Sequence, residues 1–158
     1  YGSAIRELSA LKHKNMEDGL WNAFHTDGKT VYNPKLMTMP KGTDFATIHK
    51  VERYRDWYAD NKHVYYENRL LHGANPKTFM VLPSHYLSEV EVSTINKSDT
   101  YSCDGSHVYY RDSLMSGVDI ASFICGYDFV AGQSFAFDKN RYYQGAPNSR
   151  IEKLRQRK

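Results

Sequence analysis

The sequence predicts an α+β protein built from tandem repeats, each a β-hairpin followed by a short helix, stacked into one array with an N-terminal capping helix. The main observation is a phrase that recurs along the chain: an Asp, a few turn-forming residues, and then one or two Tyr. Copies begin at Asp27, Asp60, Asp104 and Asp138, which are separated by 33, 44 and 34 positions. Self-similarity at such a period indicates that one supersecondary unit is copied and stacked.

The best copy of the repeat shows why each unit is expected to begin as a hairpin. Residues 57–59 and 64–66 are Trp-Tyr-Ala and Val-Tyr-Tyr, which favour strands, and Asp-Asn-Lys-His at 60–63 separates them. Asp, Asn and Gly tolerate the positive φ that tight hairpin turns require. The sequence therefore predicts a hairpin in each copy, and the recurring Tyr, Asp and Gly are expected to be scaffold.

A short helix is expected after each hairpin. In the best copy a turn at 73–74 leads to Asn75 and Pro76, a pair that is typical of helix starts because Pro lacks the N–H that would have no partner there. Equivalent segments begin at Gly42 and Gly117, and in each of them Asp stands two residues later. These segments are predicted to pack onto their hairpins.

Both ends of the chain are predicted to be helical. Residues 3–14 carry apolar side chains at helical spacing after a possible Ser3 cap, and this helix is expected to cover the open end of the array. A longer helix is predicted from Ser149, which stands in capping-box spacing with Glu152. The expected domains are a cap at 1–20 and a repeat domain at 21–158, with units at about 23–52, 56–99, 100–133 and 134–158.

The interval between the second and third Asp exceeds the next interval by ten residues. The surplus lies in Pro83–Asp99, where spaced Leu, Val and Ile predict an added strand or loop. An insertion into one copy of a repeat often forms a binding element. The alternative is an edge strand that completes the sheet, and the sequence favours neither.

Charge and hydropathy narrow the class of partner. Of the 158 residues 25% are charged, and the net charge of +3 is too modest to indicate a nucleic-acid partner. No stretch approaches the roughly 18 consecutive apolar residues of a membrane span. The chain begins at Tyr1, so either a leader has been removed or the sequence has been trimmed, and a periplasmic or otherwise exported location is expected.

Three segments carry a resemblance to a known family. They are Asp-Lys-Asn followed by Tyr-Tyr within 138–143, Asp-Asn-Lys-His-Val-Tyr-Tyr at 60–66, and Gly-Ala-Asn-Pro-Lys-Thr-Phe at 73–79. Together they resemble the bacterial DKNYY repeat family, over roughly residues 24–158. The resemblance implies an often exported protein with no catalytic residues to carry over. Some members of the family resemble small immunity proteins that are encoded beside toxins.

The two cysteines, Cys103 and Cys125, fall in one repeat at positions that are apolar in another copy. A disulfide between them is expected; it would close a loop of about 20 residues, stabilise the fold by about 3 kcal/mol and require an oxidising compartment such as a periplasm. The alternative is two buried free thiols that act as small hydrophobic residues.

No residue pattern indicates catalysis or a metal centre. His63 and His107 recur at the same place beside a hairpin turn, which the repeat explains without a ligand. The chain has no P-loop, GxGxxG, CxxC or paired-carboxylate signature. We therefore expect no enzyme activity, no metal and no cofactor.

Aromatic residues interleaved with charged ones are expected to bind protein, because Tyr, Trp and Arg dominate interface hot spots. The sequence thus predicts a non-enzymatic protein-binding module of the bacterial envelope, most concretely an immunity protein that neutralises an antibacterial toxin by occlusion. The alternative is a structural or glycan- and peptidoglycan-binding envelope protein. The candidate interface residues are Tyr54, Trp57, Tyr66, Tyr86, Glu89, Glu91 and Tyr110.

Overall fold

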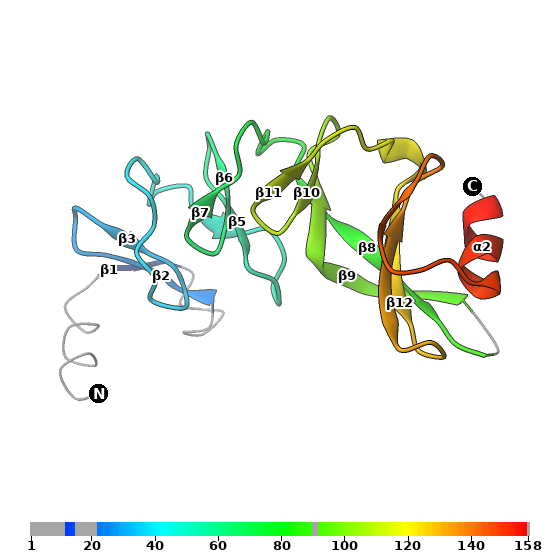
Figure 1. Cartoon of the computed structure of the whole chain (residues 1–158). Helices are drawn as coiled ribbons and strands as arrows, with labels where there is room; N and C mark the ends of the chain where they lie inside the picture. The colour runs from blue at the N-terminus through cyan, green and yellow to red at the C-terminus, as the bar shows by residue number, and fades with distance from the viewer. Residues whose placement is uncertain (1–11, 15–21, 90–91, 158) are drawn as a thin grey trace. The chain divides into compact units, whose positions relative to one another are not determined.

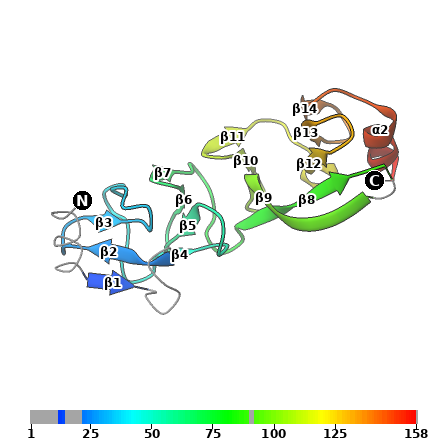
Figure 2. The same cartoon turned by 90° about the horizontal axis from the view of Figure 1, so that it is seen from below.

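The computed structural model describes residues 12–14, 22–89 and 92–157. The chain divides into two compact units, Tyr1–Phe79 and Met80–Lys158, and both are built mainly from β-strands (Figures 1 and 2). Within the described ranges the one α-helix is α2, at Ser149–Gln156. The predicted α+β array of hairpins and helices is therefore wrong, and each unit is described below by itself.

The first unit holds two small antiparallel sheets. The three-stranded sheet has the order β1–β2–β3 and the four-stranded sheet the order β4–β5–β6–β7. The strands are β1 (Lys12–Lys14), β2 (Phe24–Thr26), β3 (Val31–Tyr32), β4 (His49–Lys50), β5 (Trp57–Ala59), β6 (Val64–Tyr66) and β7 (Arg69–Leu70). Side chains from both sheets and the intervening loops share one core, which consists of Phe24, Val31, Met39, Ile48, Tyr58 and Tyr65.

The second unit is one seven-stranded sheet, in the order β11–β10–β9–β8–β12–β13–β14. The strands are β8 (Met80–Leu87), β9 (Val92–Cys103), β10 (Val108–Tyr110), β11 (Ser113–Met115), β12 (Ile124–Asp128), β13 (Gln133–Phe137) and β14 (Tyr142–Gln144). β8 and β12 pair in parallel and the other neighbours are antiparallel. α2 covers one face, where Ile151 and Leu154 pack with apolar side chains of β8, β12 and β13 (Figure 1).

The predicted hairpins are confirmed as local structure. They are formed by β2–β3, β5–β6, β9–β10 and β13–β14, and an Asp begins the turn of each. In the turn of β9–β10, for example, Asp104 Oδ1 accepts hydrogen bonds from the backbone N–H of Ser106 and of His107. Gly28 and Gly105 follow their Asp at φ of 93° and 90°, the left-handed conformation that glycine adopts at least cost.

The short helices predicted after the hairpins are wrong. Asp44 begins a single turn that Ile48 closes by donating its N–H to the Asp44 carbonyl, and the third equivalent is the 3₁₀ turn η3 (Ile120–Ser122). In these segments the helix-start signal therefore determines the conformation of a single turn and does not extend it into a helix. The residues that follow are strand formers, and pairing within the sheets extends them into β4, β8 and β12.

The two predicted terminal helices have different outcomes. Residues 12–14, the end of the expected helix at 3–14, form β1, which pairs with β2; the remainder lies outside the described residues. The C-terminal helix is confirmed as α2. Its cap is Asn148 rather than Ser149, because the Asn148 side chain accepts the Ile151 N–H at 2.9 Å.

The surplus segment Pro83–Asp99 lies in the long β8–β9 hairpin. Its strands occupy the centre of the seven-stranded order, so of the two alternatives the edge strand is wrong. The pairing shifts register between Val81 and Pro83 and again between Ser84 and His85. Such irregularities increase the local twist of a sheet. The hairpin thus places β9 beside β10 on one side and β8 beside β12 on the other.

One set of hydrogen bonds, which we name the turn bracket, ties a hairpin turn to the loop that precedes it. In the first unit Asp60 Oδ2 accepts from the Asp44 N–H at 3.0 Å and from the Tyr65 hydroxyl at 2.9 Å. The Thr47 hydroxyl oxygen accepts the Asn61 N–H at 2.9 Å. The carboxylate of Asp60 therefore organises its own turn, a distant loop and a buried tyrosine at once.

The second unit contains the same turn bracket with other residues. Asp138 Oδ2 accepts from the Asp119 N–H at 2.9 Å and from the Tyr143 hydroxyl. The Ser122 hydroxyl oxygen accepts the Lys139 N–H at 2.9 Å. Asp60 and Asp138 are both buried, so their hydrogen bonds form away from water. The recurring Asp and Tyr of the sequence are thus structural in these two copies.

Candidate functional site

The face of the seven-stranded sheet opposite α2 carries a groove of about 300 Å³. Strand alternation explains which side chains reach it. Leu87 and Ile124 point to the α2 side and pack with that helix, whereas their neighbours Tyr86 and Cys125 point to the groove. β8, β9, β12, β13 and β14 all contribute to the lining, so the groove follows the middle of the sheet.

Aromatic rings form one wall of the groove. The Phe129 ring lies 5.4 Å from the Tyr86 ring and 4.9 Å from the Tyr127 ring, measured between centroids. Phe129 is 62% exposed, and the adjacent Val130 is also exposed. Large apolar side chains in contact with water at the edge of a groove are typical of a binding surface.

The opposite side of the groove is polar. The Tyr101 hydroxyl donates to Gln144 Oε1 at 2.7 Å, and burial raises the pKa of Tyr101, so this hydroxyl stays protonated. Ser98 Oγ accepts the N–H groups of Thr100 and Tyr101. Other polar side chains that line the groove are Ser84, Asp99, Thr100 and Ser134. The groove thus combines aromatic surface with hydroxyl, amide and carboxylate groups.

Cys125 forms part of the groove floor as a buried thiol. Its Sγ donates a hydrogen bond to the Pro83 carbonyl at 3.4 Å. Burial raises the pKa of Cys125 to about 12, and burial also raises the pKa of Cys103. Thiolate is the reactive form of cysteine, so both thiols are expected to be unreactive at neutral pH.

The strand order separates the two cysteines that the sequence pairs in a disulfide. Cys103 lies opposite Met80 and Cys125 lies opposite Ser84, on the two sides of β8. An offset of four residues along a strand is about 13 Å, whereas a disulfide requires Cα atoms within about 7 Å. Both cysteines are free in this structure, and the expected disulfide is not formed.

Thiol labelling checks this arrangement directly. We expect the native, unreduced protein to react slowly with a thiol reagent, because both sulfur atoms are buried, and to release two reactive thiols when it is denatured without reductant. Mass spectrometry of the labelled chain gives the count. If denatured protein labels only after reduction, the cysteines are bonded and the strand order around β8 is incorrect.

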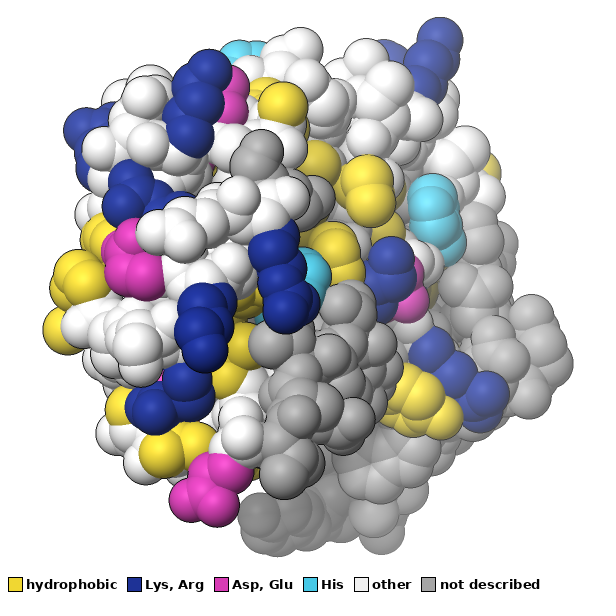
Figure 3. All heavy atoms as spheres, turned by 90° about the vertical axis from the view of Figure 1, so that its right-hand side faces the viewer, with side chains coloured by type: hydrophobic (Ala, Val, Ile, Leu, Met, Phe, Trp, Pro, Cys, Tyr) yellow, Lys and Arg dark blue, Asp and Glu magenta, His cyan; other side chains and the backbone are white. Residues whose placement is uncertain are grey.

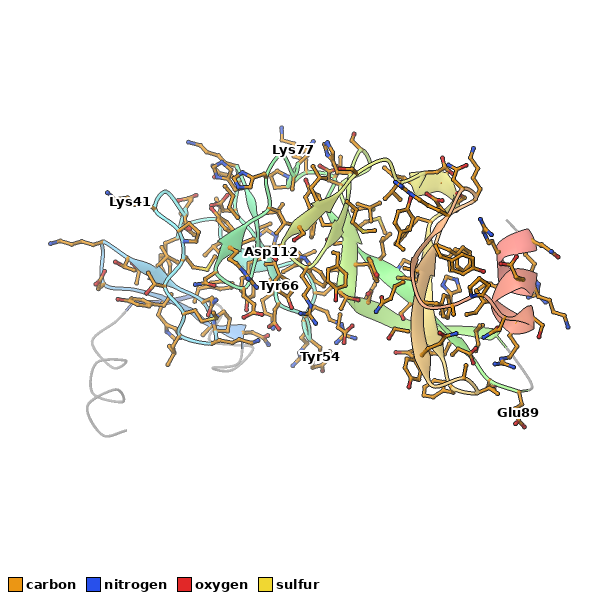
Figure 4. All side chains as sticks on the ribbon, viewed as in Figure 1. Lys41, Tyr54, Tyr66, Lys77, Glu89 and Asp112 are labelled. Atoms are coloured by element: carbon orange, nitrogen blue, oxygen red, sulfur yellow. The ribbon has the colours of Figure 1, made fainter. Side chains whose placement is uncertain are left out.

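The structure separates the predicted interface residues into groups. Trp57 and Tyr66 are buried, with their rings 5.2 Å apart, so they serve packing and cannot meet a partner. Tyr110 is partly buried against Tyr101, at 5.3 Å between ring centroids. Tyr54 is 78% exposed in the loop between β4 and β5 and points away from the ribbon (Figure 4).

Tyr86 lies on β8, and Glu89 lies just after the end of that strand. Tyr86 lines the groove, and Glu89 is exposed at the tip of the hairpin (Figure 4). Glu91 lies outside the described residues. Sequence reasoning missed Phe129 and Val130, although two consecutive apolar residues at the start of a turn could have signalled them.

Neither recurring histidine forms part of a metal-binding group in the described part of the chain. His107 Nδ1 lies 3.2 Å from the Asp104 carboxylate within the same turn, and the His63 ring lies 6.3 Å from that of Tyr65. Among the described residues no set of three or more His, Cys, Asp or Glu side chains is placed to hold a metal ion.

Comparison with protein-family models, with curated proteins and with solved structures finds no match to this chain. The resemblance to the DKNYY family therefore stays a prediction that rests on the sequence segments alone. No helix among the described residues is long and apolar enough to cross a membrane.

Proposed function

We propose that this chain is a non-enzymatic protein-binding module of the bacterial envelope, and that the groove of the seven-stranded sheet is its binding site. The observation that carries the proposal is Phe129, which projects into solvent beside the rings of Tyr86 and Tyr127. Exposed aromatic side chains beside a polar groove supply the apolar anchor and the polar rim that interfaces combine.

The backbone holds Phe129 in place before any partner arrives. The Phe129 N–H donates to the Leu87 carbonyl at 2.9 Å, and Asp128 Oδ1 accepts the N–H groups of Val130 and Ala131. An anchor that is already ordered loses little conformational entropy on binding. This rigidity supports a binding role for Phe129.

Asp128 is in turn fixed from the α2 side. Arg150 lies 3.1 Å from its buried carboxylate, and the Asn148 amide donates to it at 2.8 Å. Burial raises the pKa of Asp128, but these hydrogen bonds outweigh burial and hold the pKa below its usual value. The turn that presents Phe129 is therefore braced by a charge that stays ionised at neutral pH.

The more specific proposal is an immunity protein that occludes a toxin. It rests on the resemblance to the DKNYY family and on the basic side chains of α2. Lys and Arg side chains are spread over the end that carries α2 (Figure 3), where Arg150, Lys153, Arg155 and Arg157 lie close in sequence. A partner with acidic groups beside an apolar anchor point would complement these features.

A glycan ligand is the second candidate. It is favoured by the hydroxyl groups, the Asp99 carboxylate and the Gln144 amide that lie in the same groove as the tyrosine rings. Sugars combine apolar faces with many hydroxyl groups, so a mixed lining of this kind suits them. In this alternative the envelope ligand would be peptidoglycan or another polysaccharide.

Replacing Phe129 with alanine tests the proposal, and Leu114→Ala is the matched control. Leu114 is also an exposed apolar residue of the same sheet, on β11, and is 49% exposed. Cells that carry each variant are challenged with the toxins encoded beside the gene, and toxin co-purification is measured. We expect Phe129→Ala to lose protection and at least tenfold in affinity, and Leu114→Ala to keep both.

Two outcomes would contradict a protein partner. The first is a failure of the protection assay. Either Phe129→Ala protects cells from the toxins as well as the unaltered protein does, or deletion of the gene leaves cells normally resistant to every neighbouring toxin. In the other, purified protein sediments with peptidoglycan through the groove residues while no protein partner binds, which would favour the glycan candidate.

A further inference from the structure

The first unit contains a second cavity, of about 480 Å³, which is separate from the groove of the second unit. Its charged side chains come from the loop after β3, from β4 and from the loop between β4 and β5. The residues that line it are Asn22, Pro34, Lys35, Lys50, Arg53, Tyr54, Asp56 and Tyr58. Three of these described side chains are cationic and one is a carboxylate, so the described part of the lining carries a net positive charge.

The one carboxylate in this lining does not neutralise the cavity. Lys35 Nζ lies 2.9 Å from Asp56 Oδ2, and that hydrogen bond raises the pKa of Lys35. Burial lowers the pKa of Lys50; the charge of Asp56 partly offsets this by raising the pKa, and the positive charge of Lys35 lowers it again. Two lysines therefore lie near one another and share Asp56, which Lys35 binds directly, while Glu67 adds negative charge nearby. Lys50 and the exposed Arg53 are left as the cations that face the cavity.

Tyr58 adds a hydrogen-bond donor at the base of the cavity. It lies directly across from Lys50 in the β4–β5 pair, and its ring packs edge-on against Phe24 at 5.2 Å in the core. The side chain is fully buried, and its hydroxyl makes no well-aligned hydrogen bond to a described residue; the Asp56 carboxylate is the acceptor that it approaches. Buried hydroxyl groups are normally paired, so a missing partner calls for an explanation. Burial, and next the charge of Asp56, raise the pKa of Tyr58, which keeps the hydroxyl protonated.

We propose that this cavity binds a phosphoryl group, with Lys50 and Arg53 as the cations and the Tyr58 hydroxyl as the donor beneath them. A phosphate monoester carries close to two negative charges at neutral pH, which matches three cations against one carboxylate. Its several oxygen atoms can accept from an ammonium, a guanidinium and a hydroxyl at the same time. The site lies in the first unit and does not depend on the function proposed for the second.

The test is a titration of the full chain with inorganic phosphate and with glycerol phosphate, in which NMR chemical shifts are recorded at each step. Ionic strength is kept constant, and acetate serves as the reference anion. We expect shifts at Lys50, Arg53 and Tyr58. Arg53→Gln and Lys50→Gln should weaken binding at least tenfold. Tyr58→Phe, which keeps the packed ring, should weaken it severalfold. The control is Lys77→Gln, an exposed lysine of the same unit that points away from the cavity (Figure 4), and its affinity should be unchanged.

Vesicles that contain phosphatidylglycerol form a further arm, which separates a lipid headgroup from a soluble phosphate. Binding of the soluble probes together with the vesicles, with the same variants impaired, supports a headgroup as the natural source; binding of the soluble probes alone supports a free phosphate ester. The proposal is overturned if neither soluble probe binds, if acetate binds as well as phosphate, or if Lys77→Gln weakens binding as much as Arg53→Gln.

Discussion

Replacing Gly126 with alanine is expected to disrupt the seven-stranded sheet, with a loss of more than about 4 kcal/mol in the stability of the second unit. A Cβ at this position would lie 1.9 Å from the His85 carbonyl oxygen and 2.8 Å from the Phe135 ring. Neither neighbour can yield cheaply, because His85 contributes backbone of the parallel β8–β12 pair and Phe135 is fully buried.

Hydrogen exchange of the backbone amides in β8 and β12 measures this effect. The matched control is Gly132→Ala, at a glycine of the same unit with φ of 64°, where an added Cβ would lie 4.0 Å from the Tyr127 hydroxyl oxygen. The control should lose only about 1 kcal/mol, the cost of placing alanine in the left-handed region. Native protection in Gly126→Ala would mean that β8 and β12 do not approach as closely as described.

Replacing Asp60 with alanine is expected to lower the stability of the first unit by about 3 kcal/mol or more. The substitution removes the acceptor for the N–H groups of Lys62, His63 and Asp44 and for the Tyr65 hydroxyl. Leaving buried donors without partners costs about 1–3 kcal/mol each where water cannot replace the lost acceptor. Exchange rates in β5 and β6 report the loss.

Asp27→Ala is the control, since Asp27 fills the same turn position but is exposed, and it accepts hydrogen bonds from Lys29 and Thr30 of its own turn. Its loss should be clearly smaller. Acid should mimic the Asp60 substitution: burial raises the pKa of Asp60, but its hydrogen bonds outweigh burial and lower the pKa below 3.8. The stabilisation is therefore complete above about pH 4 and is lost as the pH falls through the folded pKa. Equal losses in the two variants would contradict a special role for Asp60.

The local part of the fold could be predicted from sequence because its determinants are local. Asp at the start of each turn captures N–H groups two and three residues ahead, so Asp27, Asp60, Asp104 and Asp138 mark four real hairpins. The C-terminal helix was equally accessible, since Asn148 and the residues after it carry a cap and good helix formers.

The rest of the fold depends on pairing between distant strands. The start signals at Asp44 and Asp119 predict helices, yet each yields one turn before a strand, because the sheet offers hydrogen bonds that a short helix cannot match. The parallel pairing of β8 with β12 joins segments about 40 residues apart. Nothing local in either segment specifies that neighbour.

The candidate site was predicted only in part. Tyr86 was anticipated and lines the groove, but Trp57 and Tyr66 are buried in the first unit. The same large aromatic side chains suit hot spots and cores, so composition alone cannot separate the two roles. The sequence does not predict Phe129, because its exposure depends on the tertiary structure. The buried Asp128 carboxylate holds the turn that follows it, and this turn leaves the Phe129 side chain in water.

The turn bracket is present in both units, although the sheets around it differ in strand number, strand length and pairing. Each copy is complete within its own unit: Asp60 closes onto Asp44, and Asp138 closes onto Asp119. A loop and hairpin of this kind is therefore a self-contained module, whose hydrogen bonds do not depend on the strands that lie beside it. Asp60 and Asp138 therefore mark the internal repeat more clearly than the strands around them do.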